Sequence, residues 1–314
     1  MPEGVTLSVL LLAGGIVALY AGAELLVAGA ARLALGIGLR AATVGVTVVA
    51  FVTTAPELFV ATIGALDVSG DIGLGTVVGS NVANIGLVLG LAALIRPLPI
   101  SSLVLRRHVP FMLLAAFLLL GLAADGTIGR LEGAILLAVL AGFTGYLLYY
   151  VNTDPAPETN EEGSGEGVTV RTALLVVGGL IALVIGSRWL ITGGRGLLAA
   201  MGFSDLFIGL TVLALGTSLP ELAASVVGAV RGETAFSIGN VVGSNIYNVL
   251  AVLGIVALIV PISVSPGTLR FELPAMVAFT LLLVGMMAHG DELSRVDGAI
   301  LVFGYVGFVY LLFP

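Results

Sequence analysis

The 314-residue sequence contains no cysteine and no lysine, and charged residues of any kind are scarce. The lack of cysteine excludes disulfide bonds and thiolate metal sites. Charged residues make up 10% of the chain, whereas a soluble domain carries about 25%. Hydrophobic residues make up 59%. A chain of this composition cannot cover itself with a water-compatible surface, so the sequence predicts an integral membrane protein.

The chain is a duplicated half. TVVAFVTTAPEL (47–58) returns as TVLALGTSLPEL (211–222) with seven of twelve positions identical. The same offset of 164 residues aligns GTVVGSNVANIGLVLG (75–90) with GNVVGSNIYNVLAVLG (239–254), at ten of sixteen positions. The first repeat motif therefore covers 47–90 and the second covers 211–254. Each copy places one glutamate, Glu57 or Glu221, inside an apolar segment.

Apolar runs of about 20 residues, the length that crosses a bilayer, predict ten transmembrane helices. They are 5–31, 40–66, 71–95, 107–124, 127–150, 170–196, 204–230, 235–259, 271–289 and 294–313. Five spans per half is an odd number, so the second half must enter the membrane from the opposite side. The predicted fold is an all-α membrane protein with ten transmembrane helices in two inverted five-helix repeats. The first repeat is 1–150, an acidic linker is 151–169, and the second repeat is 170–314.

The arginines predict the orientation, because cytoplasmic loops carry an excess of basic residues. Eight fall on one side of the ten-span topology and three on the other. The eight are Arg32, Arg40, Arg96, Arg106, Arg107, Arg171, Arg231 and Arg295, and the three are Arg130, Arg195 and Arg270. We therefore expect a multi-pass protein of the cell membrane with a cytoplasmic linker and both termini outside.

The two glutamates lie in the middle of their spans, where an ionised carboxylate costs at least a few kcal/mol. No arginine lies at a comparable depth in the second, third, seventh or eighth span. The remaining partners are a proton, a polar neighbour or a bound cation. Pro56 and Pro220 precede the glutamates and lack an N–H, so they release carbonyls one turn earlier. The candidates lie near Val52 and Thr53 and near Gly216 and Thr217.

Polar side chains recur at helical spacing around both glutamates. Those that share a helix face with a glutamate, or with each other, are Thr53, Thr54, Thr217 and Ser218, and the pairs Ser80–Asn84 and Ser244–Asn248. Carboxylates, hydroxyls, amides and free carbonyls are the hard oxygen ligands that calcium and sodium use. Instead of binding a cation, each hydroxyl can donate a hydrogen bond to a carbonyl of its own helix. Each glutamate can instead hold a proton. For Asn81 and Asn245 we expect helix packing.

At these residues the sequence resembles the cation/calcium antiporter superfamily, and most closely its prokaryotic sodium/calcium exchangers. The resemblance lies in the paired motifs TTAPEL with GSNVAN and GTSLPEL with GSNIYN. It implies that Glu57 and Glu221 hold calcium and share sodium, and that spans 1 and 6 move across a core of spans 2, 3, 7 and 8. It also implies oxygen ligands at the carbonyls of Ala50 and Ala214 and at the side chains of Thr53, Thr54, Ser80, Asn84, Thr217, Ser218, Ser244 and Asn248. Some relatives, including potassium-dependent ones, carry an aspartate where this chain has Asn248. The absence of that aspartate argues against potassium co-transport by this chain.

The sequence therefore predicts a sodium/calcium antiporter that works as a monomer in the lipid bilayer. We expect no enzymatic activity, no cofactor and no nucleic-acid partner. A calcium/proton antiporter uses the same glutamates and is the nearest alternative. An intramembrane carboxylate-dyad protease and a passive channel are the alternatives from other classes. Glu24 and Arg188 occupy equivalent positions of the two halves, and the sequence leaves open whether they pair or extend separately to the interface.

Overall fold

The computed structural model describes residues 3–36, 41–67, 70–153, 169–201, 216 and 218–312. These residues are helical apart from connecting loops and four two-residue strands. The elements of the first half, with η for a π-helical turn, are α1 (Glu3–Gly36), α2 (Ala41–Val44), η1 (Gly45–Val49), α3 (Ala50–Thr53), α4 (Ala55–Asp67), α5 (Gly70–Ala83), η2 (Asn84–Leu89), α6 (Gly90–Ile95), β1 (Leu98–Pro99), η3 (Val104–His108), α7 (Val109–Leu122), β2 (Thr127–Ile128) and α8 (Arg130–Thr153). Those of the second half are α9 (Val170–Ala200), α12 (Leu219–Arg231), α13 (Thr234–Tyr247), η5 (Asn248–Leu253), α14 (Gly254–Ile259), β3 (Ile262–Ser263), η6 (Thr268–Glu272), α15 (Leu273–His289), β4 (Glu292–Leu293) and α16 (Arg295–Leu312).

Within the described ranges, eight helical segments are long and apolar enough to cross a membrane. They are Val5–Leu33, Gly73–Ile95, Val104–Leu122, Arg130–Tyr149, Val170–Leu198, Thr234–Ile259, Thr268–His289 and Arg295–Leu312. They coincide with eight of the ten expected spans, so the chain is a multi-pass helical membrane protein. The expected span 40–66 is helical over its described residues, 41–66, but interrupted by a turn at Thr54. The expected span 204–230 lies partly outside the described residues, and the count of ten stays a prediction.

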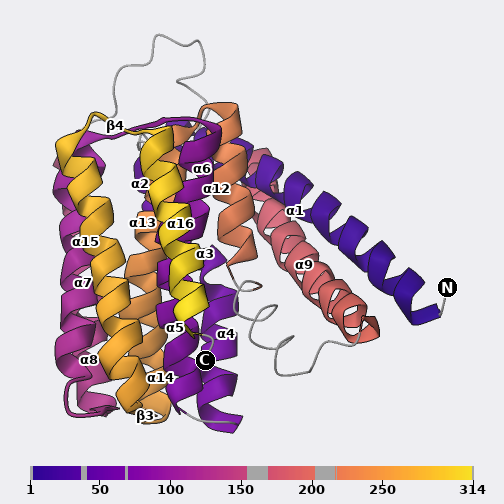
Figure 1. The fold of residues 1–314 in the computed structure, drawn as a ribbon. Helices are drawn as coiled ribbons and strands as arrows, with labels where there is room; N and C mark the ends of the chain where they lie inside the picture. The colour runs from indigo at the N-terminus through magenta and orange to yellow at the C-terminus, as the bar shows by residue number, and fades with distance from the viewer. Residues whose placement is uncertain are drawn as a thin grey trace.

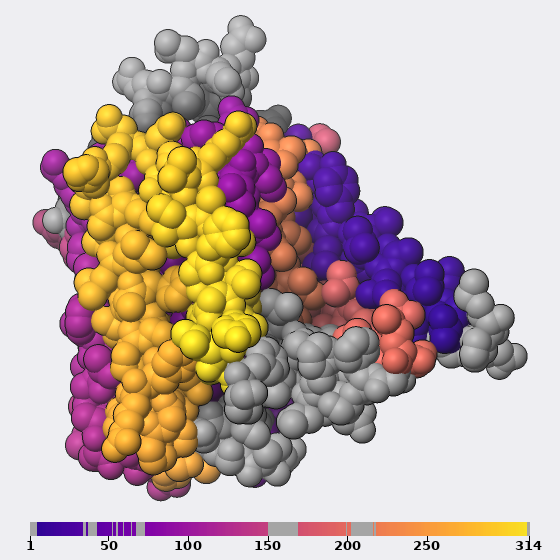
Figure 2. Space-filling view, in the orientation of Figure 1, coloured from indigo at the N-terminus to yellow at the C-terminus, as the bar shows by residue number. Residues whose placement is uncertain are grey.

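Helices α1 and α9 form a pair that slants away from the remaining bundle (Figure 1). They run antiparallel, because Gly15 contacts Gly186 and Leu190 whereas Gly29 contacts Val176. Glycine makes this close packing possible. A Cβ at Gly22 would lie 2.8 Å from the backbone nitrogen of Leu183, closer than packed atoms allow. In the space-filling view the pair projects from the bundle as a separate arm (Figure 2).

Two short antiparallel strand pairs join the halves at opposite ends of the molecule. Strand β1 pairs with β4, and β2 pairs with β3; Figure 1 places β4 at one end of the bundle and β3 at the other. Arg96 and Arg295 gather at the β1–β4 end. Arg96 lies 3.0 Å from the position of a Cβ on Gly232, and Arg295 donates to the Ile95 carbonyl at 3.5 Å. These arginines were expected on one side of the membrane, and they share one end of the fold.

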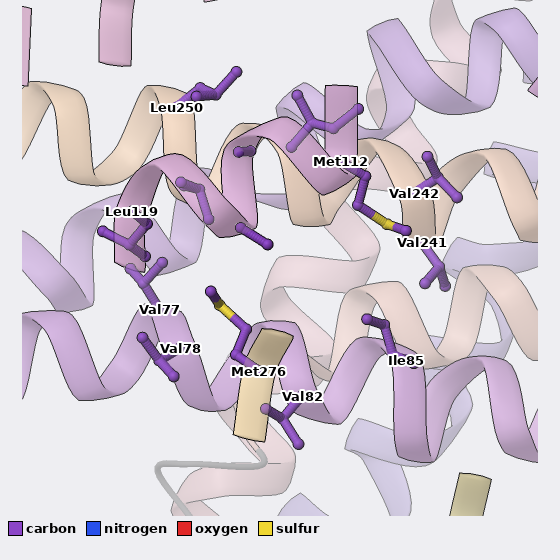
Figure 3. Close-up of a cluster of buried hydrophobic side chains, with 14 of the residues drawn as sticks. Val77, Val78, Val82, Ile85, Met112, Leu119, Val241, Val242, Leu250 and Met276 are labelled. Atoms are coloured by element: carbon purple, nitrogen blue, oxygen red, sulfur yellow. The ribbon is translucent and has the colours of Figure 1, made fainter. Parts of the chain in front are cut away.

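The most buried helices are the two that carry the GSN motifs. In the most apolar 18-residue stretches of Gly73–Ile95 and Thr234–Ile259, 72% and 83% of the residues are buried, against 17–39% in the corresponding stretches of the other six spans. Valines and leucines of these two segments pack with Met112 of α7 and Met276 of α15 (Figure 3). Gly243 of α13 lies directly against α3 and η1, since a Cβ there would be 2.6 Å from that of Ala50. The lack of a side chain at Gly243 therefore permits a close approach of the two backbones.

Candidate ion-binding site

Both buried glutamates begin a helix. Glu57 lies in the first turn of α4 and Glu221 in the first turn of α12, each directly after a proline. The side chains are 0% and 1% exposed. A helix start carries unpaired N–H groups and the positive end of the helix dipole, which favour negative charge there. Each carboxylate therefore lies at a helix N-terminus in the interior of the protein.

The two carboxylates are neighbours, close enough for their charges to repel each other. None of their four oxygens has a hydrogen-bond partner among the described residues. The Thr53 side chain lies beside the Glu221 carboxylate, but its hydroxyl donates to the Ala50 carbonyl at 3.3 Å. No ion pair to either glutamate is present in the described part of the chain. Two negative charges are thus brought together and left without a protein cation.

Further oxygens arrive from both halves. Helix α4 packs against η5, and α12 packs against η2, so each glutamate helix meets a π-turn of the other half. These turns begin at Asn248 and Asn84, both fully buried. Neither amide atom of Asn84 has a partner within the described ranges, and the same holds for Oδ1 of Asn248 and Oγ of Ser218 and Ser244. π-turns are frequent at functional sites, and here they start at the two pocket asparagines.

The threonines of the first repeat bond their own helix. Oγ1 of Thr54 donates to the Ala50 carbonyl at 2.5 Å, and Oγ1 of Thr53 donates to the same oxygen at 3.3 Å. This is the local bonding that the sequence left as an alternative. A hydroxyl that donates its proton in this way keeps its oxygen lone pairs for another partner. Both side chains are buried, so they remain compatible with a role as oxygen ligands.

The other expected ligands divide into two groups. Ser80 is buried in α5, in the turn before Asn84. Ala214 and Thr217 lie outside the described residues, so their expected places at the site are not described. Among the described members, the elements that carry Glu57, Glu221, Asn84 and Asn248 come together through the packing of α4 with η5 and of α12 with η2.

Two features were missed by the sequence reasoning. The Ser187 hydroxyl of α9 donates to the Gly216 carbonyl at 2.7 Å; Pro220 was expected to release this carbonyl, but the donor was not foreseen. A second polar cluster lies one turn from the pocket, where Asn240 Nδ2 donates to Ser225 Oγ at 3.1 Å. Ser225 follows Glu221 by four residues, and that helical spacing was its only sequence signal. Ser187 carried no signal, because its contact depends on how α9 packs.

Comparison with known proteins identifies the family to which this arrangement belongs. A family profile described as "Sodium/calcium exchanger protein" matches residues 7–149 and 171–313. The chain belongs to the sodium/calcium exchanger protein family. The match covers both halves, and its interruption at 150–170 coincides with the acidic linker expected at 151–169.

Relatives of this exchanger family align over nearly the whole chain. The sodium/calcium exchanger MaX1 of Methanosarcina acetivorans is 30% identical over 98% of this chain and 99% of its own length. The inner membrane protein YrbG of Escherichia coli is 32% identical over 97% of this chain and 96% of its own. A solved structure of the sodium-calcium exchanger NCX_Mj superposes with a TM-score of 0.86 at 28% identity, covering 98% of this chain and 99% of that one. The chain is therefore a cation/calcium antiporter by family, and the family consists of transporters.

Proposed function

We propose that this protein exchanges sodium for calcium across the cell membrane. One observation carries the proposal: two buried carboxylates lie together, with no basic side chain paired to them in the described part of the chain. Two negative charges are balanced by one calcium ion or by two sodium ions. The neutral oxygens of Asn84, Asn248 and the surrounding hydroxyls supply the hard ligands that both ions prefer.

The proposed ligand set combines the residues at these positions in both repeats. It comprises Ala50, Thr53, Thr54, Glu57, Ser80, Asn84, Ala214, Thr217, Ser218, Glu221, Ser244 and Asn248. The two ion loads use overlapping sites, so binding of one excludes the other. With the glutamates neutralised by either load, the site can change the side to which it opens; with bare charges it cannot, because ionised carboxylates in a closed core are too costly. This difference enforces exchange and prevents leak.

The proposed transport cycle depends on an inverted repeat of 1–150 and 170–314 joined by a cytoplasmic linker, with both termini outside. The antiparallel packing of α1 with α9 supports this arrangement. So does the placement of equivalent strands β1 and β3 at opposite ends of the bundle. Alternating access then exchanges the conformations of the two halves around a fixed site. We propose that one chain is sufficient, since the whole site comes from its own two halves.

The test is calcium uptake into proteoliposomes that contain the purified protein. An outward sodium gradient should drive uptake, and a pH gradient of equal size without sodium should not. Uptake driven only by the pH gradient would instead identify the alternative, a calcium/proton antiporter, which the same buried carboxylates favour because they can carry protons. Calcium flux without any counter-ion would indicate a passive channel. Peptide cleavage by the purified protein would instead support the alternative of an intramembrane carboxylate-dyad protease.

A further inference from the structure

Three buried asparagines form a chain of hydrogen bonds that crosses from one half of the protein to the other. The Asn81 side chain on α5 donates from Nδ2 to the backbone carbonyl of Asn245, at 3.3 Å. The Asn248 side chain donates from Nδ2 to Asn81 Oδ1, at 2.9 Å. Asn81 is 4% exposed and Asn248 1%, so no solvent competes for these bonds.

The Asn245 carbonyl determines the donor-to-acceptor direction of every hydrogen bond in this series. An amide side chain has a donor end and an acceptor end, and which end is which must be read from its partners. A backbone carbonyl has no proton, so the end of Asn81 that faces it must be the NH₂ group. Met276 Sδ, a weak acceptor 3.6 Å from the same nitrogen, agrees with this assignment. The opposite end of Asn81 is therefore an oxygen, and it can only accept.

An accepting oxygen on Asn81 determines the orientation of Asn248. The NH₂ group of Asn248 must turn toward Asn81, so its own oxygen points the other way. That oxygen is buried and has no protein partner within the described ranges. It belongs to the residue that begins η5, against which the Glu57 helix packs. A cation can bind this amide only through oxygen, since the NH₂ end presents positive charge.

We propose that Asn81 is a positioning residue: it holds the Asn248 amide with its oxygen toward the transported cations. The inference rests on the proposed function, because it assigns a role at the same ion site. Asn81 itself does not touch an ion. It acts by removing the second orientation of Asn248, in which the NH₂ group would face calcium or sodium.

The equivalent chain in the other half is not made in this structure. The offset of 164 residues maps Asn81 onto Asn245 and Asn248 onto Asn84. Among the described residues, Asn245 Nδ2 reaches only Met112 Sδ, at 3.9 Å. Asn245 Oδ1 and both amide atoms of Asn84 have no partner among the described residues. Asn245 therefore provides a matched control: a buried asparagine of the same motif whose side chain orients no pocket residue here.

The test is a double-mutant cycle between Asn81→Leu and Asn248→Asp. Asn81→Leu removes the accepting oxygen and lets the Asn248 amide turn. Because a hydrogen bond of this kind is worth a factor of roughly five in equilibrium, K0.5 for calcium should rise about five-fold with little change in maximal rate. In the Asn248→Asp background both outer atoms of residue 248 are oxygens, so orientation no longer matters. There the same substitution should raise K0.5 by less than about two-fold.

The control variant is Asn245→Leu, and it is compared by the same measurement of K0.5 for calcium. Asn245→Leu should change K0.5 by the same factor in both backgrounds. An equal factor for Asn81→Leu in both backgrounds would overturn the proposal and reduce Asn81 to a packing residue. If Asn81→Leu fails to fold, Asn81→Ala makes the same comparison, with melting temperatures without ions recording packing damage.

Equilibrium binding of radioactive calcium to the purified protein, measured in parallel, separates this inference from the proposed function. Absent sodium-driven flux in the wild type would refute the function. A background-dependent change in calcium binding would even then support the positioning role. Normal flux with equal factors in both backgrounds would refute the positioning role alone.

Discussion

Glu24 of α1 forms an ion pair with Arg231, the last residue of α12. Neither outcome left open by the sequence occurs, since Glu24 neither pairs with Arg188 nor stands alone. The Glu24 and Arg231 side chains are 23% and 42% exposed, so the pair contributes less than about 1 kcal/mol to stability. We expect Glu24→Gln to lower the melting temperature by a few degrees at most. The reversed pair, Glu24→Arg with Arg231→Glu, should restore it.

The pair also connects two parts of the protein that the proposed cycle moves. Helix α1 belongs to the slanting α1–α9 pair, and α12 carries Glu221 (Figure 1). If α1 slides across the core during transport, this contact must break in each cycle. Glu24→Gln should therefore change the exchange rate, although it lowers the melting temperature by a few degrees at most. A rate equal to wild type under saturating sodium and calcium would show that α1 and α12 do not separate.

Neutralising either buried glutamate should abolish calcium transport. Glu57→Gln and Glu221→Gln each remove half of the central charge while keeping the side-chain volume. The fold should survive, and stability should increase, because the substitution removes a buried charge that has no protein partner in the described chain. Radioactive calcium uptake at matched expression measures the loss, and thermal denaturation measures the fold. Near-normal exchange in either variant would contradict the site.

Ser187→Ala tests the contact between α9 and the start of the Glu221 helix. The Gly216 carbonyl would lose its hydroxyl donor, at a cost of about 1 kcal/mol. We expect a lower melting temperature and an altered exchange rate, because this bond also joins the slanting pair to the core. Ser187→Thr keeps the hydroxyl and is the matched control. Indistinguishable alanine and threonine variants would mean that the bond carries no energy.

The orientation can be tested with single cysteines, since the chain has none of its own. Ser164→Cys lies in the acidic linker, and Thr127→Cys lies in β2, where Thr127 is exposed. The inverted arrangement places the two positions on opposite sides of the membrane. An impermeant thiol reagent applied to intact cells should label Thr127→Cys only. Labelling of Ser164→Cys would overturn the orientation, and labelling of both would overturn the five-span half.

The local geometry of the candidate site could be predicted in part, because it depends on short-range spacing. Pro56 and Pro220 predict where the helices that carry Glu57 and Glu221 begin. The helical spacing of Thr53 and Thr54 predicts that their hydroxyls bond to a backbone carbonyl of the preceding turn. The Asn81–Asn248 bond and the Ser187–Gly216 bond could not be predicted. Each joins residues far apart in the chain, so it depends on how the helices pack. The π-turns at Asn84 and Asn248 had no sequence signal for a similar reason, since tertiary packing overrides helix propensity.

The duplication carries one more expectation, about the conformation that opens to the other side. The offset of 164 residues maps Glu24 onto Arg188 and Arg231 onto Asp67, the last residue of α4. The charges are exchanged, so the equivalent contact is again an attractive pair. Arg188 is exposed here, whereas its counterpart Glu24 forms the ion pair with Arg231. If the halves exchange conformations, Arg188 should pair with Asp67 when the site opens to the opposite side.

Charge reversal tests this expectation without trapping a state. Arg188→Glu should slow sodium-driven calcium exchange, because it places two acids where a pair is needed. Adding Asp67→Arg should restore the rate, whereas Asp67→Arg alone should slow it. The reversed Glu24–Arg231 pair provides the comparison in the half where the contact is observed. The reversed Glu24–Arg231 pair could restore the exchange rate while the reversed Arg188–Asp67 pair does not. That result would mean that the halves do not exchange conformations, and the inverted-repeat cycle would have to be abandoned.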